Sequence, residues 1–395
     1  MSKILTKLGI VTDNDKMLMS LSFVLFIPIL LDFIAGFTSG QSSNITMIVY
    51  GVTFIFVFIQ GWSRISINNI FTVLLLYFIC FLNAVIFPNS VDYVGIPQYL
   101  ILLFYLPLGF VLFRTIKSWS SFINILFVFA PFAILIGIYI IFFTSVTTLD
   151  SSETYITYME FSYALLPFVC ASYAYYHSKK RIGGLIMYIV GIAEMLSFGC
   201  RGALVCALFF AILLSFGISS QRKWMFITLL LIVVIAAFNL DSIFGFLSRF
   251  SLFENSHVLR KALEGDVFQH ESRNEILLNC ENRLSSMGIE ISGLFGDRPY
   301  CGSVYPHNII YEILMQWGWI LGSFLLLLLA IVFVKGYMRD PVSRMVTIFF
   351  GCAALGRFFV SDSYLNNGLF WIMIACMLSV ISTKDKRMVN GKGND

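Results

Sequence analysis

Three residues in the second half of the chain could together act on a phosphate-bearing substrate. Arg201 lies between glycines in LSFGCRGALV, Arg273 lies in HESRNEIL, and His307 follows Pro306 at the start of an apolar stretch. Guanidinium groups bind phosphate oxygens through paired donors, and an imidazole can accept a proton near neutral pH. These residue types therefore point to phosphate chemistry, with the two arginines as anion ligands and His307 as proton acceptor.

Four further residues are candidates for substrate binding. Arg298 lies in LFGDRPY, and Arg357 lies near the end of an apolar stretch in GCAALGRFF. Asn308 is next to the histidine, and Glu194 lies seven positions, about two helical turns, before the first of the arginines. A structural role is the alternative, because a long side chain can extend to a membrane surface and a lone histidine is often structural.

Apolar stretches long enough to cross a membrane must position these side chains. The 395 residues are 58% hydrophobic and 12% charged, a composition that excludes a water-soluble single domain. We predict an all-α polytopic membrane protein of about twelve transmembrane helices, because lipid offers no partner for unpaired backbone groups. The predicted spans are 17–35, 45–61, 68–87, 97–113, 121–143, 159–176, 182–199, 202–217, 224–240, 307–334, 345–360 and 367–382. The first lacks a small-residue cleavage site and is interpreted as an uncleaved anchor.

Basic residues fall in alternate connections between the predicted spans. The connections 36–44, 88–96 and 144–158 contain none. The termini and the short connections that alternate with these hold 18 of the 26 basic residues, among them Arg64, Arg114, Lys117, Arg181, Arg222, Lys335 and the tail 383–395. By the positive-inside rule both termini are cytoplasmic, which places His307 at the periplasmic face of a bacterial inner membrane.

One large polar segment, 241–306, interrupts the single integral-membrane domain and is predicted to lie in the periplasm. It carries six basic residues. Long translocated segments can escape the charge rule, or a cationic surface could hold an anionic substrate, and both explanations stay open. The pattern predicts helices near Asn255–Glu264 and Glu271–Met287, followed by a glycine- and proline-containing return, Gly293–Pro306.

The same segment contains Cys280 and Cys301, which an oxidising compartment would permit to form a disulfide. None of the eight cysteines belongs to a CxxC pair, and the chain contains neither an HExxH motif nor a P-loop. We therefore expect no metal and no cofactor. Because no nucleotide pool exists outside the membrane, an activated sugar would have to arrive on a lipid carrier.

Residues 190–330 resemble the O-antigen polymerase and O-antigen ligase superfamily of integral-membrane glycosyltransferases. The first shared feature is an arginine followed by small residues, CRGALV; the second is the pair Ser272 and Arg273, followed by LFGDR. The third is the pair His307 and Asn308 before YEILMQWGWILG. In one respect the chain departs from the family, which commonly has serine before the first arginine, where this chain has Cys200.

The resemblance implies a GT-C-like fold and metal-independent transfer of a glycan from undecaprenyl diphosphate to an acceptor hydroxyl. By position, Arg201 and Arg273 would bind the donor diphosphate and His307 would activate the acceptor. In a polymerase the acceptor is another lipid-linked repeat unit, and in a ligase it is the core sugar of lipid A. We favour the polymerase of lipopolysaccharide biosynthesis, because polymerases are the more divergent group. Expected partners are the lipid-linked donor and acceptor, membrane lipid and a chain-length regulator in the membrane, with no nucleic acid.

A transporter or flippase for a lipid-linked sugar is the alternative from another class. It predicts charged residues along both halves of the spans. The embedded charges cluster instead toward the predicted outer half, which favours an outward-facing site; they are Asp32, Glu160, Glu194, Arg201 and Arg357. No internal repeat is visible, which also speaks against a repeat-built transporter.

Overall fold

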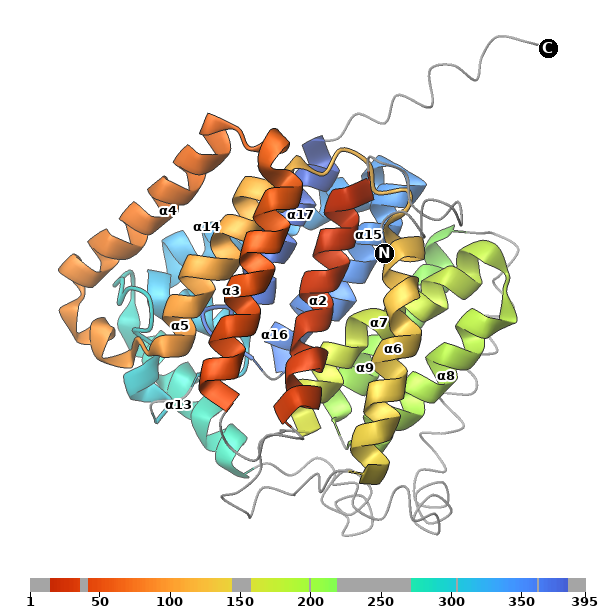
Figure 1. Ribbon diagram of the computed structural model, residues 1–395. Helices are drawn as coiled ribbons and strands as arrows, with labels where there is room; N and C mark the ends of the chain where they lie inside the picture. Colours follow the sequence, from red (N-terminus) through yellow and green to blue (C-terminus); the bar gives the residue numbers. More distant parts are fainter. Residues whose placement is uncertain are drawn as a thin grey trace.

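The computed structural model describes residues 15–35, 42–143, 158–198, 200–218, 271–302, 305–360 and 362–382 (Figure 1). Every regular element in these ranges is helical, and they contain no strand. Among the described residues, seven helical segments are long and apolar enough to cross a membrane, and three shorter apolar helices accompany them. The chain is therefore a polytopic membrane protein.

The helices follow the predicted spans closely. In chain order they are α2 (Lys16–Ala35), α3 (Ser42–Gly61), η2 (Trp62–Arg64), α4 (Ile67–Ile86), η3 (Pro88–Tyr93), α5 (Ile96–Leu100), η4 (Ile101–Tyr105), η5 (Leu108–Leu112), η6 (Phe113–Thr115), α6 (Phe122–Phe143), α7 (Tyr158–Lys179), α8 (Ile182–Ser197), α9 (Arg201–Ile218), α13 (Glu271–Met287), η9 (Arg298–Tyr300), α14 (Ile309–Arg339), α15 (Pro341–Phe350), η10 (Gly351–Leu355), α16 (Gly356–Val360) and α17 (Gly368–Ser382).

Each predicted span apart from 224–240 coincides with one or more of these segments, and the predicted helix Glu271–Met287 is confirmed as α13. Residues 224–240, the predicted helix 255–264 and the tail 383–395 lie outside the described residues. The total of about twelve helices and the GT-C arrangement therefore stay predictions.

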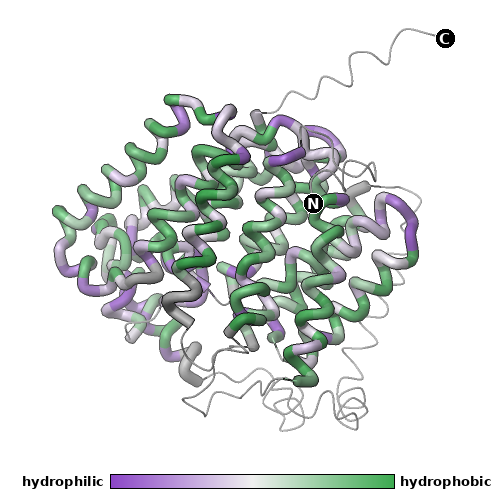
Figure 2. Tube along the Cα trace, in the orientation of Figure 1, coloured by the Kyte–Doolittle hydropathy of each residue, from purple (hydrophilic) through white to green (hydrophobic). Residues whose placement is uncertain are grey.

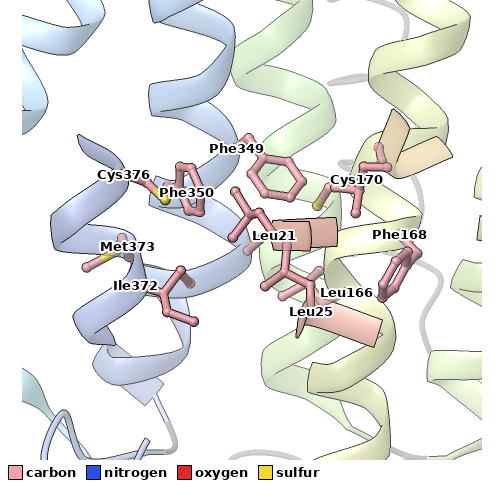
Figure 3. Close-up of a cluster of buried hydrophobic side chains, with 14 of the residues drawn as sticks. Leu21, Leu25, Leu166, Phe168, Cys170, Phe349, Phe350, Ile372, Met373 and Cys376 are labelled. Atoms are coloured by element: carbon pink, nitrogen blue, oxygen red, sulfur yellow. The ribbon is translucent and has the colours of Figure 1, made fainter. Parts of the chain in front are cut away.

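The core of the bundle is a cluster of large apolar side chains that includes residues of α2, α7, α15 and α17. Leu21 and Leu25 of α2 lie close to Phe168 of α7 and to Phe349 of α15, and the cluster continues to Met373 of α17 (Figure 3). All five side chains are buried. Between membrane helices such contacts stabilise by van der Waals packing, because lipid is as apolar as the side chains.

The two ends of the bundle differ in the residues that they carry. Helix α17 runs from one end to the other. One end, here called the basic end, holds Ser382 together with Arg64, Arg114 and Lys117. The opposite end, here called the loop end, holds the segment 289–302 and the turn 362–367. Figure 2 shows hydrophilic residues at the helix ends and connections, with hydrophobic residues along the helices between them.

Helix α14 breaks at Gly318, whose φ of 71° and ψ of 173° are not helical. Beside the break, the carbonyl of Gln316 accepts hydrogen bonds from the backbone N–H groups of Ser292 (3.0 Å) and Gly293 (2.9 Å). A Cβ atom at position 318 would lie 2.6 Å from the carbonyl oxygen of Glu290. Glycine is therefore required at the point where the loop-end segment docks against α14.

We expect Gly318→Ala to destabilise the protein more than Gly288→Ala. Both glycines have positive φ, 71° and 60°, but a Cβ atom at Gly288 has nothing within 4 Å. Positive φ costs alanine about 1 kcal/mol or more at either site, and at 318 the ψ of 173° lies in a region open essentially only to glycine. The backbone clash at 318 adds about 1–3 kcal/mol. Thermal unfolding of the two purified variants in detergent measures the difference. Equal midpoints would contradict a tight docking of the segment at the break.

Candidate functional site

A buried ion network at the loop end is centred on Arg298, which is 3% exposed. Its Nη1 lies 2.5 Å from Oδ2 of Asp297, and its Nη2 lies 3.5 Å from Oε1 of Glu312 on α14. Nη2 also donates to Oγ of Ser363 at 3.0 Å. Gln316 donates from Nε2 to Oδ1 of Asp297 at 2.5 Å. The guanidinium is therefore occupied by protein ligands from three separate parts of the chain.

The turn 362–367 completes this network from the other side. The Ser363 hydroxyl donates to Glu312, and the Tyr364 hydroxyl donates to Oε1 of Gln316 at 2.5 Å. Burial raises the pKa of Asp297, against the opposing effect of the neighbouring Arg298. Two carboxyl groups share one guanidinium here, so the network has no surplus cation for an anionic substrate.

A second polar cluster surrounds Arg357 on α16. Its Nε lies 2.6 Å from Oδ2 of Asp362, and its Cζ lies 4.7 Å from the ring centre of Tyr163 on α7. Asp32 of α2 interacts electrostatically with Glu160 and with Arg357. The Arg357 side chain is partly exposed, at 16%, and one carboxylate among the described residues pairs with it. It is therefore more available to an anion than Arg298.

Tyr305 lies between the two clusters. Its ring centre is 5.6 Å from Cζ of Arg298 and 4.4 Å from the ring of His307. It also interacts electrostatically with Arg357 and Asp362. Burial raises the pKa of Tyr305 to about 12, so its hydroxyl keeps its proton at neutral pH and can donate a hydrogen bond.

The backbone conformation of His307 is set by the junction at which it lies. Its φ is +56°, a left-handed value that costs a non-glycine residue about 1 kcal/mol or more. The next residue, Asn308, is the N-cap of α14, and its Oδ1 accepts from the N–H of Ile310 at 2.9 Å. Asn308 was predicted to bind substrate, and the structure gives its side-chain oxygen a capping role.

The remaining predicted residues are less tightly grouped. Arg201 is the first residue of α9 and is half-buried, directly after Cys200, whose thiol interacts electrostatically with Arg357. Arg273 lies in the first turn of α13, and its side chain lies outside the described residues. The buried carboxyl of Glu194 packs over Gly137 of α6, and neither oxygen has a hydrogen-bond partner among the described residues.

The structure thus gathers Arg298, Arg357 and His307 around Tyr305. The sequence prediction missed Tyr305 and Asp362. The signal for Tyr305 was its position two residues before the histidine, and the signal for Asp362 was an acidic residue five positions after an arginine in an apolar stretch.

A protonated phenol, an imidazole and a partly exposed guanidinium can bind an anion and accept a proton from a nearby hydroxyl. The described residues include no group of side chains that could hold a metal ion.

Cys280 and Cys301 lie beside this region with their Sγ atoms 3.5 Å apart, and both are free thiols in the structure. Both are buried. The pair proposed from the sequence is therefore in contact, and a disulfide stays a prediction. An unchanged gel mobility and mass on reduction would rule it out.

We expect Arg298→Met to unfold the loop end, because it leaves Asp297 and Glu312 buried without their cation. Breaking a buried ion pair in this way costs about 3–5 kcal/mol. The control is Arg283→Met, because Arg283 pairs with the exposed Glu290 at 3.1 Å, and exposed pairs contribute about 1 kcal/mol or less. The thermal unfolding midpoints of the two variants in detergent should differ by several degrees. A midpoint for Arg298→Met equal to that of the control would argue against the structural role.

Comparison of the chain with protein-family models, with curated proteins and with solved structures finds no match. The assignment of function therefore depends on the site and on the sequence pattern.

Proposed function

We propose that the protein is an O-antigen polymerase of the bacterial inner membrane, with its active site at the loop end facing the periplasm and both termini in the cytoplasm. It would transfer a glycan from undecaprenyl diphosphate to a hydroxyl group of another lipid-linked repeat unit. The observation that carries the proposal is the position of His307, which lies against Tyr305 beside two arginines at one end of an apolar helical bundle.

The proposed reaction needs a base and an anion site. The acceptor hydroxyl gives its proton to the imidazole of His307, and its oxygen forms a bond to the anomeric carbon of the donor sugar. The bond from that carbon to the phosphate oxygen breaks, and undecaprenyl diphosphate leaves with the electron pair. Guanidinium groups would stabilise the negative charge that develops on the leaving phosphate.

The contacts of the arginines distinguish their proposed roles. Arg298 is enclosed by two carboxylates and is proposed to hold the fold together. Arg357 is partly exposed and pairs with one carboxylate, so we propose that it joins Arg201 and Arg273 in binding the diphosphate. Tyr305 would donate a hydrogen bond to a phosphate or sugar oxygen from between the clusters.

We expect His307→Ala to abolish long-chain polysaccharide while the protein remains in the membrane. Loss of a general base typically costs a factor of about 10²–10⁴ in rate. The measurement is the gel ladder of surface polysaccharide in a deletion strain that expresses the variant. Single repeat units should still appear on the lipid core, since flipping and ligation do not need the polymerase.

Arg273→Ala is expected to give the same ladder, and Arg283→Ala on the same helix α13 is the matched control, with normal chain lengths. A ladder of normal length from His307→Ala or Arg273→Ala would contradict the proposal. Loss of the single units as well would assign the protein to ligation or flipping instead.

Arg201→Lys should also shorten the polysaccharide, since it keeps the charge but replaces a two-pronged donor by a single ammonium group. The same gel assay measures the effect. Chains of normal length in this variant would exclude a paired guanidinium–diphosphate contact at Arg201.

A further inference from the structure

A second candidate site lies at the basic end, at the far end of α17 from His307. A cavity of about 700 Å³ opens there between the α3–α4 turn, the η6 region and the end of α17. Three cations line it, Arg64, Arg114 and Lys117, together with hydroxyl and amide side chains that include Ser66 and Asn69. No carboxylate among the described residues lines this cavity.

These cations come from two separate connections between helices and meet at one cavity. The positive-inside rule explains basic residues near the ends of spans, but it does not explain why they converge. Arg114 is directed toward α4, because its Nη1 donates to Oγ1 of Thr72 at 3.5 Å. Three like charges around one concave space repel one another, and an anion between them removes that repulsion.

An apolar groove of about 510 Å³ lies directly beside the cationic cavity. The described residues that line it are all apolar: Phe58, Trp62, Ile65, Ile70, Val73, Leu74 and Val111. The two spaces share a border: Ile65 lies between two cavity residues in sequence, and Asn69 of the cavity donates from Nδ2 to the carbonyl of Val111 at 3.4 Å.

The groove opens at the surface of the bundle. Helix α4 lies at its edge (Figure 1), and 11% of this span is buried in the protein. Trp62, at the border of the groove, is 74% exposed. Tryptophan is enriched at membrane–water interfaces, where one side of the ring contacts acyl chains and the other the headgroups.

We propose that the cavity and the groove together bind an anionic phospholipid, with the phosphate among Arg64, Arg114 and Lys117 and an acyl chain along α3 and α4. Charge complementarity selects the headgroup, because arginine binds phosphate through paired donors and lysine contributes a point charge. The adjoining apolar groove favours a lipid over a free phosphate ion. The site is separate from the proposed transferase site and does not depend on it.

Quenching of Trp62 fluorescence by brominated acyl chains tests the proposal. The full-length protein is placed in nanodiscs of phosphatidylcholine that contain a rising fraction of brominated phosphatidylglycerol or of brominated phosphatidylcholine. The Trp62→Phe variant identifies the contribution of this residue among the six tryptophans. Brominated phosphatidylglycerol should quench Trp62 at a several-fold lower fraction than brominated phosphatidylcholine.

Charge variants give the matched comparison. Each of Arg64→Gln, Arg114→Gln and Lys117→Gln should weaken the preference for phosphatidylglycerol about fivefold. Arg181→Gln removes one charge from the α7–α8 turn, outside both cavities, and should leave the preference unchanged.

Equal quenching of Trp62 by the two lipids would overturn the proposal. This comparison can be made without any variant of the cationic cavity. Equal weakening by Arg181→Gln would overturn it too, since it would indicate general surface charge. Protection of Lys117 from amine labelling by inorganic phosphate, without preferential quenching of Trp62, would instead assign the cavity to a free anion.

Discussion

A single guanidinium, that of Arg298, keeps two carboxylates from different parts of the chain together in a region closed to solvent. Unpaired charges in such a place cost several kcal/mol each, so Asp297, Glu312 and Arg298 can be buried only as a group. The hydroxyl of Ser363 is part of the same group. The loop-end segment, the start of α14 and the turn 362–367 are thereby held in one arrangement, and Tyr305 and His307 lie on the chain between the first two.

This arrangement separates residues that hold the site from residues that can act in it. Asn308 caps a helix and Arg298 neutralises carboxylates. Gly318, which has no side chain, leaves room for the backbone of the loop-end segment. Arg357, by contrast, is partly exposed and pairs with one carboxylate among the described residues. Side chains that bind a substrate must be held in place by the packing and hydrogen bonds of neighbouring residues. Where most neighbours are apolar, this support comes from a few polar contacts such as those of Arg298.

Much of the fold could be predicted from the sequence, because an apolar stretch in lipid must satisfy its own backbone and so becomes a helix. Stretch lengths therefore located α2 and α14, and the loop helix α13 followed from its start and stop signals. The contacts of Arg298 could not be predicted, because they join it to Glu312 of α14 and to Ser363 of the turn 362–367, and residue spacing does not reveal such tertiary contacts. Spacing likewise could not reveal that Tyr305 lies between the clusters, since the approach of its ring to Arg298 is also a tertiary contact.

The break at Gly318 also bears on the depth of the proposed site in the membrane. At 1.5 Å per residue the stretch Trp319–Arg339 is about 31 Å long, which matches the hydrocarbon thickness of a bilayer by itself. Trp319, directly after the break, is 45% exposed, as expected where acyl chains give way to headgroups. In the proposed orientation the first turns of α14 would stand above the hydrocarbon, and the imidazole would reach the layer that holds the phosphates of the proposed carrier lipid. The proposed transfer would then take place in water while the polyprenyl tail stays dissolved in the membrane.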